Sequence, residues 1–225
     1  MNPYFNITYP LSERLIAEVK NSYGEGPRCS VSTEHRGGFP RIGPLSLEVR
    51  HNRRDEQIIC GWGEFAIHES LLEEFDKEGF TGYRVKPAKI RFRDGSEATD
   101  YREFIVTGWA GRASPESGVQ LVQSCAGCSH KEYSAITNYD NVVDWSQWTG
   151  EDFFIVWPMA AYKLVTERVA LWLIARKVKS VRLEGGFTER EGQPIISRLG
   201  FTVGCLSDYL PKDLAIKYGV PLGLE

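Results

Sequence analysis

The clearest pattern of hydrophobic and polar positions lies in the last third of the chain. Phe153–Trp157 is an unbroken run of aromatic and β-branched residues, which predicts a short buried strand. Pro158 removes a backbone donor and ends that strand. Thr166 predicts a helix N-cap, because the residues after it form one apolar face at helical spacing. The alternation in Val181–Leu183 predicts another strand. This segment is therefore predicted to be a strand–helix–strand unit.

A similar pattern occurs earlier in the chain. When the sequence is shifted by about 98 positions, Ile67-His68-Glu69 aligns with Val165-Thr166-Glu167, and the apolar helix positions coincide without a gap. Two interpretations are open: an internal duplication, or two amphipathic helices whose similarity is accidental. A duplication predicts two related strand–helix–strand halves, at about residues 1–110 and 111–225.

Other segments add strands and short helices. Alternating residues predict strands over Tyr4–Tyr9 and Leu45–Arg50. Ser12 predicts the start of a helix that continues through Val19, and two more helices are expected over Pro194–Leu199 and Pro211–Tyr218. Strands and helices are mixed without strict alternation, and no segment resembles an interdomain linker. The sequence therefore predicts an α+β fold with mixed or antiparallel sheets and short helices, in a single domain.

Composition and charge narrow the classes of function. Apolar residues make up 42% of the chain and charged residues 25%, values that are typical of a globular protein. The formal net charge of −3 argues against a nucleic-acid binder that neutralises phosphates, and it is compatible with a basic protein partner. No apolar run is long enough to cross a bilayer, and Met1–Phe5 lacks the features of a secretory signal. We therefore expect a cytoplasmic protein that binds neither nucleic acid nor membrane.

The cysteines indicate a metal site. Five cysteines in a chain without an export signal favour reduced thiols or a metal over a disulfide framework. Cys125 and Cys128 are separated by two residues, the spacing at which two thiolates bind one tetrahedral ion. Cys29 is a third candidate ligand, although Ser32 stands where its paired cysteine would be. Two histidines are candidates for the remaining position: His35 and His130. Zinc is the candidate cofactor, and the alternative is that the paired thiols are simply buried.

An acidic segment that carries tryptophans is a candidate for contact with a partner. Acidic surfaces steer association with basic proteins. We therefore assign partner binding to four residues of this segment: Asp144, Trp145, Trp148 and Asp152. The alternative is a solvated loop. We name no catalytic residue, because the sequence contains no nucleophile elbow, phosphate-binding loop or zinc-protease helix motif. His68 is interpreted as the residue that begins a helix.

The order of these features resembles the double-CxxCG motif proteins, a bacterial family that includes immunity proteins against swarming-inhibition toxins. The resemblance rests on these segments: Tyr4–Tyr9, Cys29 after Gly26-Pro27, Cys125-Ala126-Gly127-Cys128, Asp152-Phe153-Phe154 and Leu164-Val165-Thr166-Glu167-Arg168. The family pattern would have a cysteine at Ser32 and glycines at Thr33 and Ser129, so the first knuckle is degenerate here. The resemblance implies a cytoplasmic protein that neutralises a cognate protein toxin by binding it, without catalysis.

Three functions therefore remain to be compared. The first is an immunity-type binding protein whose acidic, tryptophan-bearing surface covers the working face of a toxin. The second is an enzyme whose catalytic residues are too scattered for sequence motifs to reveal. The third is a zinc-stabilised structural or adaptor protein. The sequence does not identify the partner or the oligomeric state.

Overall fold

The fold combines mixed and antiparallel sheets with a few short helices, which confirms the predicted α+β class. It is a computed structural model that describes residues 4–8, 16–26, 28–35, 39–61, 63–178, 181–185 and 200–225. The strands are β1 (Tyr4–Thr8), β2 (Ile16–Val19), β3 (Ser22–Tyr23), β4 (Arg41–Ile42), β5 (Leu45–Glu48), β6 (Ile58–Gly61), β7 (Glu64–His68), β8 (Tyr83–Arg91), β9 (Glu97–Ala98), β10 (Tyr101–Val106), β11 (Gly108–Arg112), β12 (Leu121–Ser124), β13 (Lys131–Tyr133), β14 (Phe153–Trp157), β15 (Lys163–Thr166), β16 (Arg182–Gly185) and β17 (Phe201–Val203). The α-helices are α1 (Glu69–Glu78), α2 (Glu167–Ala175) and α3 (Lys212–Gly219), and the 3₁₀-helices are η2 (Pro115–Ser117), η3 (Tyr139–Asn141), η4 (Leu206–Asp208) and η5 (Val220–Leu222).

Six strands close into a small barrel. Their order is β10-β7-β6-β2-β5-β8, and pairing of β8 with β10 completes the ring. Each strand contributes apolar side chains to one buried cluster inside it: Ala17, Leu45, Leu47, Ile59, Ala66, Ala88, Ile90 and Tyr101. Gly61 also belongs to this interior, because a Cβ there would lie 2.8 Å from Leu47 Cδ2. The helix predicted from Ser12 is wrong over Ile16–Val19, since these residues pair with β5 and β6 as a barrel strand.

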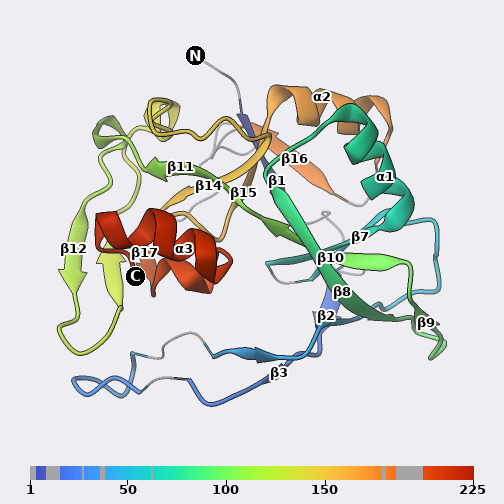
Figure 1. Ribbon diagram of the computed structural model, residues 1–225, viewed down its shortest axis with the longest axis horizontal. Helices are drawn as coiled ribbons and strands as arrows, with labels where there is room; N and C mark the ends of the chain where they lie inside the picture. Colours follow the sequence, from blue (N-terminus) through green and yellow to red (C-terminus); the bar gives the residue numbers. More distant parts are fainter. Residues whose placement is uncertain are drawn as a thin grey trace.

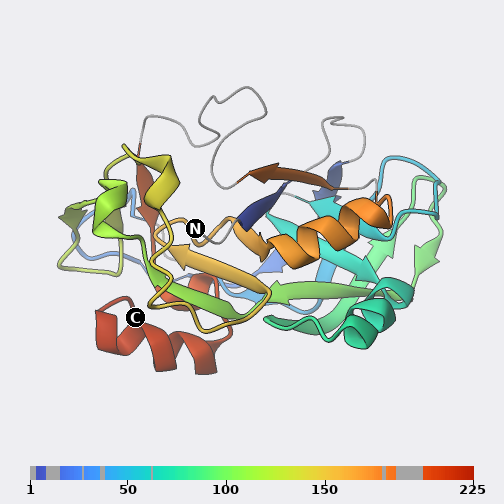
Figure 2. The same cartoon turned by 90° about the horizontal axis from the view of Figure 1, so that it is seen from above.

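A second sheet packs beside the barrel (Figures 1 and 2). Its strand order is β11-β14-β15-β1-β16. One face meets the barrel wall and the helices in the largest buried cluster, which includes Phe65, Phe75, Phe104, Phe153 and Leu173. The opposite face carries a second cluster with Phe154 and Leu164, which the segment 136–148 covers. The helix predicted over Pro194–Leu199 lies outside the described residues.

Two strand–helix–strand units have equivalent residues that differ by a constant residue number. The first unit is β7-α1-β8, and the second is β15-α2-β16. In the first unit, β10 lies between the two strands and pairs antiparallel with both, placing Arg102 opposite Ile67 and Pro87. In the second unit, β1 takes the same place, with Phe5 opposite Val165 and Gly185. Adding 98 to the residue numbers of the first unit gives those of the second, which favours the duplication interpretation.

The N-terminal strand belongs to the second unit in space. β1 pairs with β15 and β16, so this unit combines the first described residues with residues near 165 and 183. In the sheet, β1 lies between β15 and β16, and Figures 1 and 2 draw these three strands together. The two units therefore do not correspond to a division of the chain at about residue 110.

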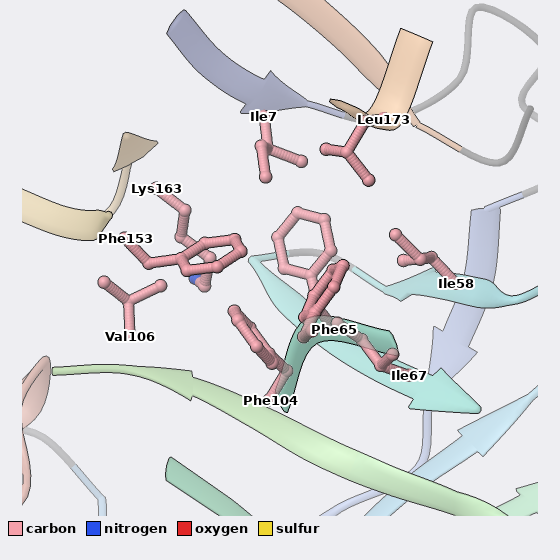
Figure 3. Close-up of a pocket in the computed structure, with 10 residues that line it drawn as sticks. Ile7, Ile58, Phe65, Ile67, Phe104, Val106, Phe153, Lys163 and Leu173 are labelled. Carbon is pink, nitrogen blue, oxygen red and sulfur yellow. The ribbon is translucent and has the colours of Figure 1, made fainter. Parts of the chain in front are cut away.

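A cavity lies between the two units (Figure 3). It is lined by Ile7, Ile58, Phe65, Ile67, Phe75, Phe104, Val106, Phe153, Lys163 and Leu173. Lys163 contributes the ammonium group in this otherwise apolar lining. Its Nζ donates to the carbonyl of Gly63 at 2.5 Å and lies 5.3 Å from the centre of the Phe65 ring. Burial lowers the pKa of Lys163.

Candidate metal centre

Two segments that are distant in the sequence meet at one cluster of cysteine and histidine side chains. The first is the loop of residues 28–35, between β3 and β4. The second is the turn between β12 and β13, which is closed by a hydrogen bond from the Cys125 N–H to the His130 carbonyl. Cys29 and His35 come from the loop, and Cys125 and Cys128 come from the turn. The chain after β3 runs along the bottom of Figure 1 toward this side of the molecule.

The four side chains converge closely enough to hold one ion. Their ligand atoms all lie within 4.8 Å of one another. Cys29 Sγ lies 3.6 Å from Cys125 Sγ and 3.7 Å from His35 Nδ1, and Cys128 Sγ lies 3.8 Å from the same nitrogen. Three sulfur donors and one imidazole nitrogen form a four-ligand set that is compatible with a tetrahedral metal site. The three predicted cysteines are therefore brought together.

The structure separates the two histidines that the sequence left as alternatives. His35 supplies the fourth ligand atom, whereas His130 stacks flat on the His35 ring, with centroids 3.8 Å apart and an interplanar angle of 9°. His130 Nε2 lies 3.3 Å from Glu132 Oε1. His130 therefore supports the orientation of His35 from the end of the turn between β12 and β13.

Backbone N–H groups stabilise the thiolates. Cys29 Sγ accepts hydrogen bonds from the N–H groups of Val31 at 3.3 Å and Ser32 at 3.4 Å. The Val31 donor, together with Ser32, lowers the pKa of Cys29 to about 6. The Gly127 N–H donates to Cys125 Sγ and lowers the pKa of that thiol. Ser32 therefore contributes a backbone donor where the family pattern would supply a cysteine ligand.

Gly127 allows the two segments to approach each other. A Cβ at this position would lie 2.6 Å from Val31 Cγ2 and 2.7 Å from Ser30 Oγ, closer than real Cβ atoms come. Glycine is therefore needed here for the loop to reach the turn.

The residues predicted to bind a partner have roles within the fold. The Trp145 and Trp148 rings are partly buried and pack on Phe154, with centroids 6.0 and 6.1 Å from its ring. Asp144 accepts hydrogen bonds from Ser146 and Gln147 in its own turn. These contacts hold the segment against the second sheet. Partner binding by these residues stays a prediction.

The expected surface position of Asp152 is wrong. Its side chain is buried, and it accepts hydrogen bonds from the Thr81 N–H at 3.0 Å and from the Thr166 hydroxyl at 3.1 Å. Arg168 lies 3.5 Å from the same carboxylate. Asp152 directly precedes β14, and these contacts join the connection between α1 and β8 in one unit to the start of α2 in the other.

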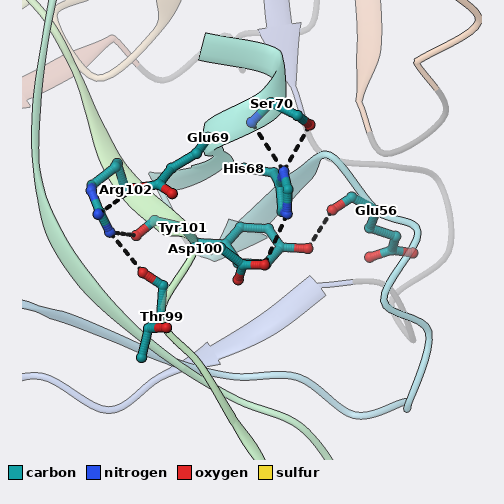
Figure 4. Close-up of polar contacts among 8 residues, drawn as sticks. All are labelled: Glu56, His68, Glu69, Ser70, Thr99, Asp100, Tyr101 and Arg102. Atoms are coloured by element: carbon teal, nitrogen blue, oxygen red, sulfur yellow. Dashed lines mark hydrogen bonds and ion pairs between the residues drawn. The ribbon is translucent and has the colours of Figure 1, made fainter. Parts of the chain in front are cut away.

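His68 begins α1, as the sequence predicted, and it also links a serine to an aspartate (Figure 4). Its Nδ1 accepts the Ser70 N–H at 3.1 Å and lies 2.8 Å from Ser70 Oγ. Its Nε2 lies 3.0 Å from Asp100 Oδ2, and its ring meets the Tyr101 ring edge to face. Since Nδ1 accepts a backbone proton, the neutral imidazole carries its own proton on Nε2 and donates it to Asp100.

No protein-family model matches this chain, and no curated protein has a significantly similar sequence. In the part of the chain that the structure describes, no helix is both long and apolar enough to cross a membrane. The resemblance to the double-CxxCG motif proteins therefore stays a prediction from the motifs.

Proposed function

We propose that this chain is a zinc-stapled binding protein of the immunity type, which neutralises a protein toxin by direct contact and has no catalysis of its own. The observation that carries the proposal is the four-ligand cluster of Cys29, His35, Cys125 and Cys128. It joins a loop to a hairpin, and all four tetrahedral positions are supplied by the protein. A closed set of this kind favours a structural ion over a catalytic one, because catalytic zinc keeps a position open for water or substrate.

Zinc suits this donor set better than the hard cations. Thiolate and imidazole ligands select zinc and other soft or borderline metals, whereas magnesium and calcium prefer oxygen. When bound, the ion would hold the thiols as thiolates and fix the loop of residues 28–35 on the hairpin. The stacked His130 and the N–H donors of Val31 and Ser32 would keep the ligands oriented.

Metal analysis of the purified, reduced protein tests the staple. We expect about one equivalent of zinc per chain, with loss of the metal in Cys125→Ser and Cys128→Ser. Cys205→Ser is the matched control, because Cys205 lies beside Ser207 and outside the cluster. The proposal would be contradicted if the wild type contains no zinc, or if both cluster variants contain as much zinc as the wild type.

The surface beside the staple supports a protein partner. Val31, Leu121 and Val122 are each more than half exposed, and they lie on the two segments that the cluster joins. Exposed apolar side chains of this size favour contact with another protein. These three side chains are exposed, whereas the two tryptophans of the acidic segment are partly buried against the second sheet. The toxin as the partner comes from the family resemblance.

Co-expression tests the immunity role. The product of each gene that flanks this one would be expressed with and without the protein in a host cell, with growth as the readout. We expect one neighbour to arrest growth and the wild-type chain to restore it. The paired change Leu121→Ser and Val122→Ser should weaken the rescue. Leu171→Ser and Ile174→Ser, which alter exposed residues on α2, should not. If no neighbour is toxic and none co-purifies with the protein, the immunity role is excluded.

An enzyme is the second candidate, and one observation favours it. Ser70, His68 and Asp100 form a serine–imidazole–carboxylate chain in which the imidazole lone pair faces the hydroxyl. A fluorophosphonate probe tests this candidate, because it labels activated serines. Labelling that is lost in Ser70→Ala and in His68→Asn would support an enzyme, since asparagine keeps the helix cap but removes the base. Equal labelling of the wild type and both variants would mean that the contacts among Ser70, His68 and Asp100 serve only to cap the helix.

A further inference from the structure

Two thiols of the cluster, Cys29 from the loop and Cys125 from the hairpin, lie in contact. Their sulfur atoms are 3.6 Å apart. Cys29 is partly exposed and accepts two backbone N–H groups, whereas Cys125 accepts one. An exposed thiol with a second thiol in contact is the arrangement typical of redox-sensing cysteines, because an oxidant can reach the first sulfur and the second can resolve the product. The cluster therefore offers an accessible nucleophile with a second thiol beside it.

The two cysteines outside the cluster, Cys60 and Cys205, do not combine an accessible sulfur with a neighbouring thiol. Cys60 is only 1% exposed, within the core between the units. Cys205 Sγ contacts the Ser207 hydroxyl at 3.1 Å instead of another thiol. Low exposure or the absence of a neighbouring thiol makes these two sulfurs poor sites for a reversible oxidation.

We infer that Cys29 is an oxidation site for peroxides and that Cys125 resolves the oxidised product into a disulfide. This inference rests on the proposed staple and adds a second form of it. In the reduced form an ion joins the loop to the hairpin, and in the oxidised form a covalent bond joins the same two segments. The loop of residues 28–35 stays attached in both forms.

The chemistry takes place in two steps. The Cys29 thiolate attacks one oxygen of hydrogen peroxide, the O–O bond breaks, and Cys29 becomes a sulfenic acid while hydroxide leaves and is protonated to water. The Cys125 thiolate then attacks the Cys29 sulfur, so that the S–S bond forms and the S–O bond breaks, releasing a second hydroxide. The two thiolates lose two electrons, and the peroxide gains them.

Formation of this disulfide removes two of the four ligands. Only Cys128 and His35 would remain, which is too few to close a tetrahedral site, so the ion is released. Disulfide formation differs from a simple loss of zinc in one measurable way. The reduced, metal-free protein should expose the backbone after Arg28 to trypsin, whereas the oxidised, metal-free protein should protect it.

The test treats the full-length, zinc-loaded protein with hydrogen peroxide and follows three readouts. A chromogenic chelator measures zinc release, peptide mass spectrometry maps the disulfide, and limited trypsin digestion reports cleavage after Arg28. We expect zinc release, a Cys29–Cys125 disulfide and protection from trypsin in the wild type. Zinc-depleted, reduced protein should be cleaved. Cys205→Ser should behave as the wild type.

Variants of the cluster separate the roles of the thiols. In Cys125→Ser, dimedone should trap Cys29 as a sulfenic acid, because the resolving thiol is missing. Cys128→Ser should still form the disulfide between Cys29 and Cys125. Cys29→Ser should form no such bond, and dimedone labelling of the remaining cysteines should fall by about tenfold from the Cys29 signal seen in Cys125→Ser.

The outcomes distinguish this inference from the proposed function. If the reduced protein holds zinc but peroxide forms only a Cys125–Cys128 disulfide, or none, the oxidation site is wrong and the staple stands. If the reduced protein holds no zinc, the metal staple is wrong, and the mapped disulfide still decides the oxidation chemistry. Trypsin cleavage after Arg28 in the fully oxidised protein would overturn the claim that the disulfide keeps the loop attached.

Discussion

In the unit β7-α1-β8, Phe65 faces the other unit, whereas in β15-α2-β16 the matched position holds Lys163. Because the units face each other across one core, these matched residues meet, with Lys163 Nζ 5.3 Å from the centre of the Phe65 ring. The register of the strands is the same in both units, so the backbone plan does not depend on these side chains. Two units with the same strand pairing therefore place different side chains, one aromatic and one cationic, at the core between them.

The faces that point away from the junction differ more. In the first unit, that face lines a closed barrel filled by apolar side chains. In the second unit, the matched face is covered by the irregular segment of residues 136–148. The hairpin β12-β13, which carries half of the metal cluster, precedes this segment in the chain. Half of the candidate metal centre therefore belongs to the stretch of chain that leads into this covering segment.

The largest expected effect comes from making the two matched positions alike. Phe65→Lys would bring a second ammonium group into the apolar cavity beside Lys163, so we expect the free energy of unfolding to fall by at least about 4 kcal/mol. Urea denaturation measures the loss. The exchange variant, Phe65→Lys with Lys163→Phe, should recover part of it, because one lysine and one phenylalanine are present again. A loss below about 1 kcal/mol in the single variant would mean that the two side chains do not share this environment.

The dependence on pH sharpens the same comparison. Burial lowers the pKa of Lys163 in the folded chain. Between that lowered pKa and the unfolded value of about 10.4, the unfolded chain binds more protons at this site, so stability rises with pH. Lys163→Met should remove this contribution and flatten the stability profile in the range just below the unfolded pKa of about 10.4. A profile as steep as that of the wild type would assign the pH dependence to other groups.

Matched arginines provide the second test. Arg182 pairs with Glu184, whose side chain is 1% exposed, whereas the matched Arg84 pairs with Asp213, and the side chains of both are about half exposed. Arg182→Met should lower the free energy of unfolding by about 3–5 kcal/mol, because it leaves a buried carboxylate without its cation. Arg84→Met should cost less than about 1 kcal/mol, because a surface ion pair is screened by water.

A compensating change checks the cause of this difference. Glu184→Gln combined with Arg182→Met should restore part of the stability, because no charge is then left buried without a partner. Equal losses in Arg182→Met and Arg84→Met would show that the burial of Glu184 does not govern the effect. Denaturant midpoints of the four proteins, measured in one buffer, provide the comparison.

The ends of the two helices offer a reciprocal test of about 1 kcal/mol. Gly79 follows α1 with a φ of 68°, and the matched Lys177 follows α2 with a φ of 56°. The residue after each of them makes an equivalent hydrogen bond back to the helix. The Phe80 N–H donates to the Phe75 carbonyl, and the Val178 N–H donates to the Leu173 carbonyl. Lys177→Gly should stabilise the protein by about 0.5–1 kcal/mol, because it relieves left-handed backbone strain.

The opposite change should have the opposite sign. Gly79→Lys should destabilise by about 1–2 kcal/mol through backbone conformation alone, because a Cβ at Gly79 would meet no atom within 4 Å. Thermal unfolding of both variants measures the shifts. Changes of the same sign would contradict the equivalence of the two helix ends.

The sequence revealed the parts of the fold that depend on local spacing. The apolar periodicity after Thr166 and the aromatic run of Phe153–Trp157 predict α2 and β14 at nearly their observed positions. The barrel was not predictable, because Ile16–Val19 has a spacing that suits a helix and becomes a strand only through pairing with β5 and β6. Pairing between distant segments has no signal in a local window.

The candidate site follows the same rule. The spacing of Cys125 and Cys128 predicted one half of the cluster. The choice of His35 over His130 could not be made, because it depends on how a loop about 90 residues earlier reaches the hairpin. Asp152 was misplaced on the surface because its partners, Thr81 and Thr166, are distant in the sequence. A carboxylate next to a buried strand was the available clue.

The smallest expected effects distinguish how the two helices begin. His68 Nδ1 accepts the Ser70 N–H at the start of α1, whereas the matched Thr166 makes no side-chain cap and donates to buried Asp152 instead. His68→Ala should therefore cost about 1 kcal/mol, and His68→Asn only a few tenths. Thr166→Val should also cost about 1 kcal/mol, but by removing a hydrogen bond from a buried carboxylate.

Amide hydrogen exchange separates these causes. His68→Ala should speed exchange at the Ser70 amide. Thr166→Val should leave exchange in the first turn of α2 unchanged and speed it at the Thr81 amide, which donates to the same Asp152 carboxylate. Faster exchange in the first turn of α2 would mean that Thr166 caps its helix after all, and that the two units begin their helices in the same way.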